Sequence, residues 1–225
     1  MTYWILFIAI AVLSYAVQLN LQNKFKKYSN IPVSAGLRGC DVAQRMLQEN
    51  GITDVRITCI EGQLTDHYDP TKKTVNLSKD VYNGRSVTAA AVAAHECGHA
   101  VQHAVGYAPV KLRSSLVPVV QFASNWVTWV LLAGIVLINM FPGVMLAGII
   151  LFALTTLFSF VTLPVEIDAS RRAIAWMSHA GVVDSRTSQP AEEALRAAAY
   201  TYVVAALSSL GTLLYYVMIF MGRRD

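Results

Sequence analysis

The sequence predicts a mainly α-helical, multi-pass membrane protein with about four transmembrane helices and a small water-facing α+β domain. The chain of 225 residues is 55% hydrophobic and 14% charged, whereas soluble domains carry about 25% charged residues. Four apolar runs alternate with polar segments, and each is long enough to cross a bilayer as a helix. The runs are residues 3–21, 116–140, 143–163 and 198–221.

The net charge of +4 does not indicate a nucleic-acid partner, because the basic residues flank the apolar runs and form no single stripe. The lipid bilayer is the expected partner. Three cysteines, Cys40, Cys59 and Cys97, have no paired spacing, which is typical of a reducing compartment. We expect Cys97 to be a small core residue.

Residues 1–22 are expected to form the first transmembrane helix. No basic residue precedes this apolar run, and Lys24, Lys26 and Lys27 follow it. A signal peptide has the opposite arrangement. The order therefore predicts an uncleaved anchor whose N-terminus lies outside and whose next segment lies in the cytoplasm.

Residues 28–113 are expected to form the first part of the water-facing domain. Apolar residues at helical spacing predict a helix from about Cys40 that stops at Gly51. Strands are expected at 54–60, 64–68 and 74–77, with a turn at Pro70 between the last two. The edge of this sheet could accept an extended peptide as an added strand, or the hairpin could only pack under the next helix.

That next helix, Val87 to Val105 with Ser86 as its N-cap, contains the pattern H-E-x-x-H. Residues four apart lie on one helix face, so His95 and His99 can point at one zinc ion. Glu96 between them can take a proton from a water molecule on that ion. The pattern therefore predicts zinc as cofactor and Glu96 as the catalytic base.

A catalytic zinc ion needs a third protein ligand, and Glu166 is the best candidate. Residues 116–163 predict a transmembrane hairpin with charges at both ends, so it returns the chain to the side that it left. Residues 164–197 then form the second part of the domain, with a helix from Pro164 to about His179. The plainer interpretation is that Glu166 only complements the helix dipole, a role that Asp168 would fill equally. His103, one turn past His99, is expected to support the ligands or to lie at the surface, and His67 and His179 are expected to be ordinary polar residues.

The fourth apolar run, 198–221, is expected to span the membrane as the last helix. This places Arg223 and Arg224 outside, against the general rule that basic residues stay in the cytoplasm. The run could instead lie along the membrane interface or pack on the domain.

Several motifs together carry a resemblance to a known family. They are the stretch A-A-H-E-C-G-H-A-V-Q-H, the hairpin after it, E-I-D-A-S-R-R-A and L-T-D-H-Y-D-P. The chain resembles membrane zinc metallopeptidases of the YugP type. The chain is more distantly similar to the HtpX and CAAX prenyl endopeptidase group. The resemblance implies a gluzincin-like catalytic domain, split by the transmembrane hairpin, with zinc held by His95, His99 and Glu166. Ser170 stands where the distant group has a supporting aspartate, and Asp168 is a possible substitute.

The sequence thus predicts a membrane-anchored zinc endopeptidase with a cytoplasmic active site. Its expected substrates are peptides or proteins, with membrane proteins and their cytoplasmic tails as the class that the anchors favour. Candidate donors to the oxyanion are His179, Arg171 and Arg172. Two alternatives stay open. The motif could lie within the bilayer, since Glu96 is the only formal charge between Ser86 and Val110, or the protein could be an inactive membrane scaffold or adaptor.

Overall fold

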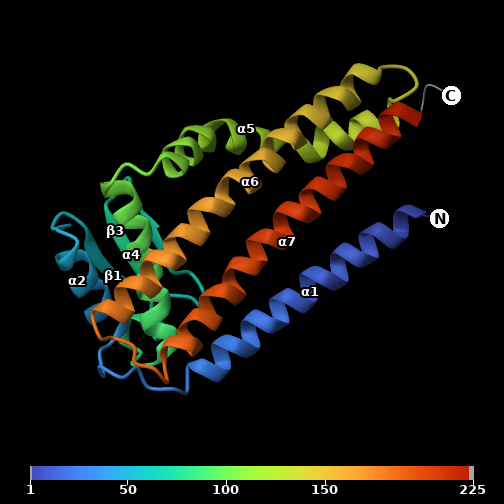
Figure 1. Ribbon diagram of the computed structural model, residues 1–225. Helices are drawn as coiled ribbons and strands as arrows, with labels where there is room; N and C mark the ends of the chain where they lie inside the picture. The colour runs from blue at the N-terminus through green and yellow to red at the C-terminus, as the bar shows by residue number, and fades with distance from the viewer. Residues whose placement is uncertain (1, 223–225) are drawn as a thin grey trace.

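The computed structural model describes residues 2–222, which form a bundle of long helices with a small domain at one end (Figure 1). The elements in chain order are α1 (Thr2–Tyr28), α2 (Gly39–Glu49), β1 (Arg56–Ile60), β2 (His67–Asp69), β3 (Thr74–Ser78), α3 (Lys79–Asn83), α4 (Val87–Ala104), α5 (Ala108–Val136), α6 (Pro142–His179) and α7 (Ser188–Met221).

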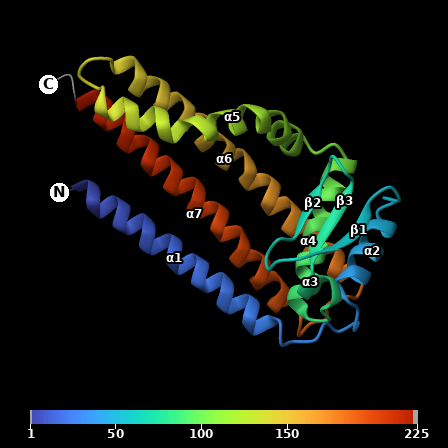
Figure 2. The same ribbon diagram turned by 180° about the vertical axis from the view of Figure 1, so that it is seen from behind.

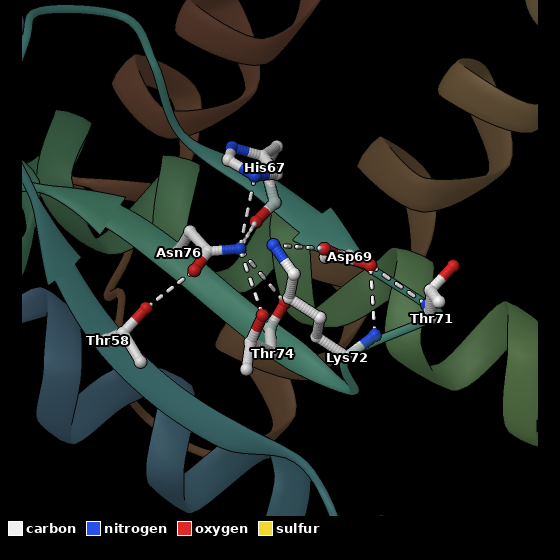
Figure 3. Close-up of polar contacts among 7 residues, drawn as sticks. All are labelled: Thr58, His67, Asp69, Thr71, Lys72, Thr74 and Asn76. Carbon is white, nitrogen blue, oxygen red and sulfur yellow. Dashed lines mark hydrogen bonds and ion pairs between the residues drawn. The ribbon is translucent and has the colours of Figure 1, made fainter.

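The three strands form one sheet in the order β1-β3-β2. The β2–β3 pair is antiparallel, as the turn at Pro70 predicts, but β1 pairs with β3 in parallel. Asn76 in the central strand accepts a hydrogen bond from Thr58 of β1 and contacts the His67 ring of β2 (Figure 3). The same view shows Asp69, which accepts hydrogen bonds from the backbone N–H groups of the turn at 2.9 and 3.0 Å. The sheet therefore leaves β2 as an edge strand.

The helix α4 is the centre of the small domain. It packs against α2, α6, α7 and the sheet, and most of its residues are buried. Ser86 caps it as the sequence predicts, accepting a hydrogen bond from the Ala89 N–H. The absence of charge around Glu96 is thus explained by burial within protein, and α4 is not among the candidate membrane spans of the described residues.

Four helices are long and apolar enough to cross a membrane, namely α1, α5, α6 and α7. They extend away from the domain in one direction, and the described ends of the chain lie at the far end of this bundle (Figures 1 and 2). Near the domain, Lys24 and Tyr28 of α1 both contact the Glu193 carboxylate of α7. This polar contact fixes α1 beside α7. Arg223 and Arg224, predicted to lie outside, fall beyond the described residues.

The strand predicted at 64–68 is misplaced, because β2 begins only at His67 and the left-handed φ of 55° at Leu64 interrupts an extended chain before it.

A predicted helix boundary is also wrong. Pro164 does not begin a helix, because α6 runs without a break from Pro142 to His179. A proline inside a helix removes one backbone hydrogen bond, but tertiary packing outweighs this loss here. Val165, Ala169 and Ala173 beyond the proline are fully buried and belong to the segment that packs on α4. The helix that carries Glu166 is therefore a direct extension of an apolar span.

Candidate metal centre

His95 and His99 lie one turn apart on α4, as the motif predicts. Their rings are almost perpendicular, with centroids 4.8 Å apart. Both side chains are mostly buried, with 14% and 12% of their surface exposed. Their Nε2 atoms face the same side chain on α6, the carboxylate of Glu166.

The approach of α6 to α4 depends on Gly98, which lies within the motif. A Cβ atom on Gly98 would lie 2.7 Å from the backbone oxygen of Ala169, which is closer than real contacts allow. The two helix backbones therefore nearly touch at this point. Because Ala169 is one turn beyond Glu166, this contact brings the Glu166 carboxylate opposite the two imidazoles.

The separations within this group fit a tetrahedral metal ion. Glu166 Oε2 lies 3.3 Å from His95 Nε2 and 3.5 Å from His99 Nε2. Two ligands each about 2.05 Å from a tetrahedral ion are about 3.3 Å apart, whereas N–H···O hydrogen bonds are usually about 2.7–3.2 Å. Glu166 Oε2 is buried and has no hydrogen-bond partner among the described residues. One ligand atom from each of the three residues lies within 4.8 Å of the others, so the donor set and its geometry suit zinc.

The close approach of Glu166 to the two imidazoles shifts the pKa values of Glu166 and His99. Burial would raise the pKa of Glu166, but the adjacent imidazoles outweigh it and hold that pKa well below its ordinary value of 4.5. For His99, burial lowers the pKa, and the carboxylates of Glu166 and Glu96 reverse the effect, so its pKa lies above 6.5. Glu166 is thus ionised at neutral pH, and protons compete with a metal ion for His99.

A buried side chain on α4, Gln102, orients His99. Its Nε2 atom donates to the Val165 carbonyl and to Asp168 Oδ2, both at 2.8 Å. Its Oε1 atom therefore faces His99 Nδ1, 3.0 Å away, and can only accept there. His99 must carry its proton on Nδ1, which leaves Nε2 free for a metal ion. Arg172 in turn donates to Asp168 Oδ2 at 2.6 Å.

Ser170 has a similar position beside the other imidazole. Its Oγ atom lies 3.1 Å from His95 Nδ1, where a hydroxyl can accept the imidazole proton. Asp168 does not replace Ser170, since it acts on His99 through Gln102 and not on His95. Each imidazole therefore has its own polar partner, and both partners lie on the face where α4 meets α6.

Two cavities meet at the metal-binding group. We call them the α7 cavity, of about 170 Å³, and the α5 cavity, of about 370 Å³. Both cavities are lined by His95, Glu96, Glu166, Asp66 and Tyr202. The α7 cavity continues along apolar side chains of α1 and α7, including Leu21, Phe25 and Leu195. The α5 cavity continues between β2 and the first turns of α5.

The catalytic candidate Glu96 is buried, with 8% of its surface exposed, yet it borders both cavities. No side chain in the described part of the chain forms a hydrogen bond to its carboxylate. Asp66 borders the same space but is committed elsewhere, because Ser78 donates to it from its backbone N–H at 2.7 Å and its hydroxyl at 3.1 Å. Burial raises the pKa of Asp66 in spite of these bonds. Among the acids that line both cavities, Glu96 is therefore the one that the described side chains leave without a hydrogen-bond or ion-pair partner.

The other predicted residues lie apart from the metal-binding group or at its margin. Cys97 is fully buried in the core, as predicted, and contacts the Ala43 carbonyl. His103 borders the α5 cavity against Tyr68, and His67 lies exposed on β2.

The three predicted oxyanion donors, His179, Arg171 and Arg172, line neither cavity. Tyr202 of α7 lines both cavities instead. It lies in an apolar run without a motif, so sequence reasoning missed it. Gln102, three residues after His99, had a helical-spacing signal that could have been used.

Comparison with known proteins identifies the family of the chain. Residues 3–221 match the family described as putative neutral zinc metallopeptidase. The chain is 43% identical to the "Putative membrane protease YugP" of Bacillus subtilis (strain 168), over all of this chain and 99% of that protein. No solved structure matches, so the gluzincin likeness stays a prediction. Because the family match extends over nearly the whole chain, the protein belongs to the putative neutral zinc metallopeptidases.

Proposed function

We propose that the protein is a membrane-anchored zinc endopeptidase with its active site on the cytoplasmic side. One observation carries the proposal. His95, His99 and Glu166 converge from two helices, and the Glu166 carboxylate lies at the distance from each imidazole that a tetrahedral ion requires. A buried carboxylate, Glu96, borders the same cavities. A purely structural zinc site has no need of such a base.

The chain supplies the groups that peptide hydrolysis needs. A zinc ion held by the three residues would supply Lewis-acid activation of a water molecule and of the scissile carbonyl. Glu96 is the group that would accept a proton from the attacking water and return it to the leaving amine. Tyr202 lines both cavities together with Glu96 and Glu166, and its hydroxyl is the donor that we propose for the oxyanion. Gln102 and Ser170 keep the imidazole protons on Nδ1.

A substrate chain can extend to both sides of the scissile bond, because the two cavities continue in different directions from the metal-binding group. This favours an endopeptidase. The edge strand β2 borders the α5 cavity through His67 and Tyr68, which supports the prediction that an extended peptide adds to the sheet there. The apolar lining of the α7 cavity suits a hydrophobic residue of a membrane protein or of its cytoplasmic tail.

The cytoplasmic assignment rests on charge. The domain end of the bundle carries Lys24, Lys26, Lys27, Lys111 and Arg113 beside the ends of the apolar runs, which is the pattern of a cytoplasmic boundary. In the described structure the far end of the bundle, the α5–α6 connection at 137–141, has no charged residue.

The intramembrane alternative keeps one supporting feature. Leu21 and Phe25 in the anchor α1 line the α7 cavity, so a substrate could approach from the lipid side at the membrane boundary. The burial of α4 inside the domain argues against placing the motif itself in lipid.

The experiment that tests the function measures zinc content and peptide cleavage together on purified protein. We expect Glu96→Gln to keep zinc and lose cleavage by about 100-fold or more. We expect His95→Ala and Glu166→Ala to lose both, because each removes a ligand.

Chelation of the wild-type protein should abolish cleavage, and added zinc should restore it. If Glu96→Gln cleaves as fast as wild type, Glu96 is not the base. If the zinc-loaded wild type cleaves no peptide in a broad mixture, the inactive-scaffold alternative is correct.

A further inference from the structure

The α5 cavity contains a cation without a counter-ion. Arg113, in the second turn of α5, lines this cavity together with Val110, Ser114 and Val117 from the same helix face. No acidic side chain of the described residues lies within ion-pair distance of Arg113, although other basic residues near the domain have such partners. Its Nε atom is buried and has no hydrogen-bond partner.

The surroundings of Arg113 leave its hydrogen-bonding edge free. Its guanidinium lies over the Phe158 ring of α6, with Cζ 6.0 Å from the ring centroid. This contact uses the flat face of the guanidinium. The N–H groups around its rim can therefore donate to a ligand in the cavity.

The acids that line the same cavity are not available to neutralise Arg113. Glu166 faces the two imidazoles, Asp66 is bonded to Ser78, and Glu96 is the proposed base. His103 adds no positive charge of its own, because burial and the charges of His99 and Arg113 lower its pKa and favour the neutral imidazole. Arg113 is thus the source of positive charge in the outer part of the α5 cavity, and a bound zinc ion would add to this potential.

A half-buried cation without a counter-ion is unfavourable, so the arrangement indicates a ligand that supplies the missing negative charge. We infer that Arg113 binds a carboxylate of the substrate in the α5 cavity and makes the enzyme selective for acidic peptides. A planar guanidinium and a carboxylate form two parallel hydrogen bonds. The carboxylate is either an Asp or Glu side chain beside the scissile bond or the free C-terminus of the peptide. This inference rests on the proposed function.

The neighbouring Lys111 provides a matched control. It carries the same charge two residues earlier on α5, but it is exposed and does not line the cavity. A lysine in that position can bind lipid phosphate at the membrane surface. Removing Lys111 therefore changes the net charge of the region without touching the cavity.

The test measures peptide binding in the Glu96→Gln background, where zinc is retained and turnover is blocked. The probes are fluorescent ten-residue peptides that differ only in one Asp or Asn, placed in turn at each position, with free or amidated C-termini. We expect the best acidic peptide to bind about tenfold or more tightly than its neutral partner. Arg113→Gln should abolish this preference, Arg113→Lys should retain part of it, and Lys111→Gln should leave it unchanged. Zinc content and the thermal unfolding midpoint of each variant show whether the site is intact.

The outcomes separate the two proposals. If the wild type cleaves peptides but Asp and Asn probes bind equally, the inference is wrong and the endopeptidase function stands. If the Asp preference depends on Arg113 but the wild type cleaves nothing, the proposed function fails and carboxylate binding stands. If the preference survives Arg113→Gln, or Lys111→Gln removes it equally, the carboxylate is held elsewhere. Dependence on a free C-terminus assigns the cavity to the peptide end, and dependence on an internal Asp assigns it to a side chain.

Discussion

At the scale of single residues, the metal-binding group depends on side chains that are not ligands. Gln102 is completely buried and uses its amide group to link His99 to Asp168 and to the backbone of α6. A group that fixes the proton of a ligand histidine changes metal affinity, typically by 10–100-fold. The network is therefore part of the metal site, although neither Gln102 nor Asp168 is predicted to touch the ion.

We predict that Gln102→Leu weakens zinc binding by about 10–100-fold. Leucine has a similar size but cannot accept the His99 proton, so the imidazole loses its preference for the tautomer with a free Nε2. Competition with a chromophoric chelator measures the affinity, and the visible spectrum of the Co²⁺-substituted protein reports the ligand geometry. Gln48→Leu, the same change at an exposed position of α2, should alter neither. An unchanged zinc affinity in Gln102→Leu would show that the network only supports packing.

At the scale of elements, the site is the product of one helix pair. The helix α4 carries the two histidines and the base, and α6 carries Glu166, Asp168 and Ser170. The two helices nearly touch at Gly98 and Ala169. Because the ligands are fixed to two rigid helices, any change in the helix spacing moves Glu166 relative to both imidazoles.

Gly98→Ala should therefore destroy zinc binding without removing a ligand. The added methyl group would lie 2.7 Å from a backbone oxygen of α6, and the helices must separate to accept it. Zinc content and the thermal unfolding midpoint should both fall. Gly143→Ala is the control, because a Cβ atom there meets nothing within 4 Å. Normal zinc content in Gly98→Ala would mean that the helix pair adjusts without cost to the site.

The connection between α6 and α7 provides an acid-sensitive element. Asp184 accepts hydrogen bonds from the Thr187 hydroxyl and from the backbone N–H groups of Thr187 and Arg186, and they lower its pKa to about 2. A lowered pKa in the folded state stabilises the protein above the ordinary value of 3.8, and the stabilisation is lost as the pH falls toward 2.

We expect Asp184→Ala to lower the thermal unfolding midpoint at pH 7. The difference from wild type should shrink between pH 4 and pH 2, because the wild-type carboxylate is protonated in that range. Ser185→Ala, in the same exposed loop, should have little effect at any pH. A difference that stays constant down to pH 2 would show that the ionised carboxylate is not what stabilises the turn.

At the scale of the whole molecule, the four apolar helices extend from one side of the domain (Figure 2). This arrangement agrees with the expectation that the domain lies on one side of the membrane and the α5–α6 connection on the other. The charge distribution supports the proposal that the domain lies in the cytoplasm.

Cysteine labelling tests the orientation directly. Of the three cysteines, Cys59 is exposed on the domain, whereas Cys40 and Cys97 are buried. A membrane-impermeant maleimide should therefore label Cys59 only after the membrane is opened. Met140, in the α5–α6 connection, is 73% exposed, and Met140→Cys should be labelled in intact cells. The reverse pattern would place the active site outside.

The sequence was sufficient for the features that depend on local pattern. The four apolar runs, the helix of the H-E-x-x-H motif, its Ser86 cap and the turn at Pro70 follow from hydropathy, helical period and backbone preference over a few residues. Family resemblance and the need for a third ligand led to Glu166, and the structure brings that residue to the two histidines. Pro164 was misread because a local helix-starting signal was overruled by packing against α4.

The remaining features come from contacts between residues far apart in the chain. No periodic pattern in one sequence indicates such contacts. They are the close approach of Gly98 to Ala169, the bonds from Gln102 to α6, the parallel pairing of β1 with β3 and the positions of Tyr202 and Arg113. Spacing along the chain told us which residues have the chemistry to hold and use a zinc ion. The packing of α4 against α6, and of both against α5 and α7, places those residues together, because only the folded chain fixes distances between separate helices.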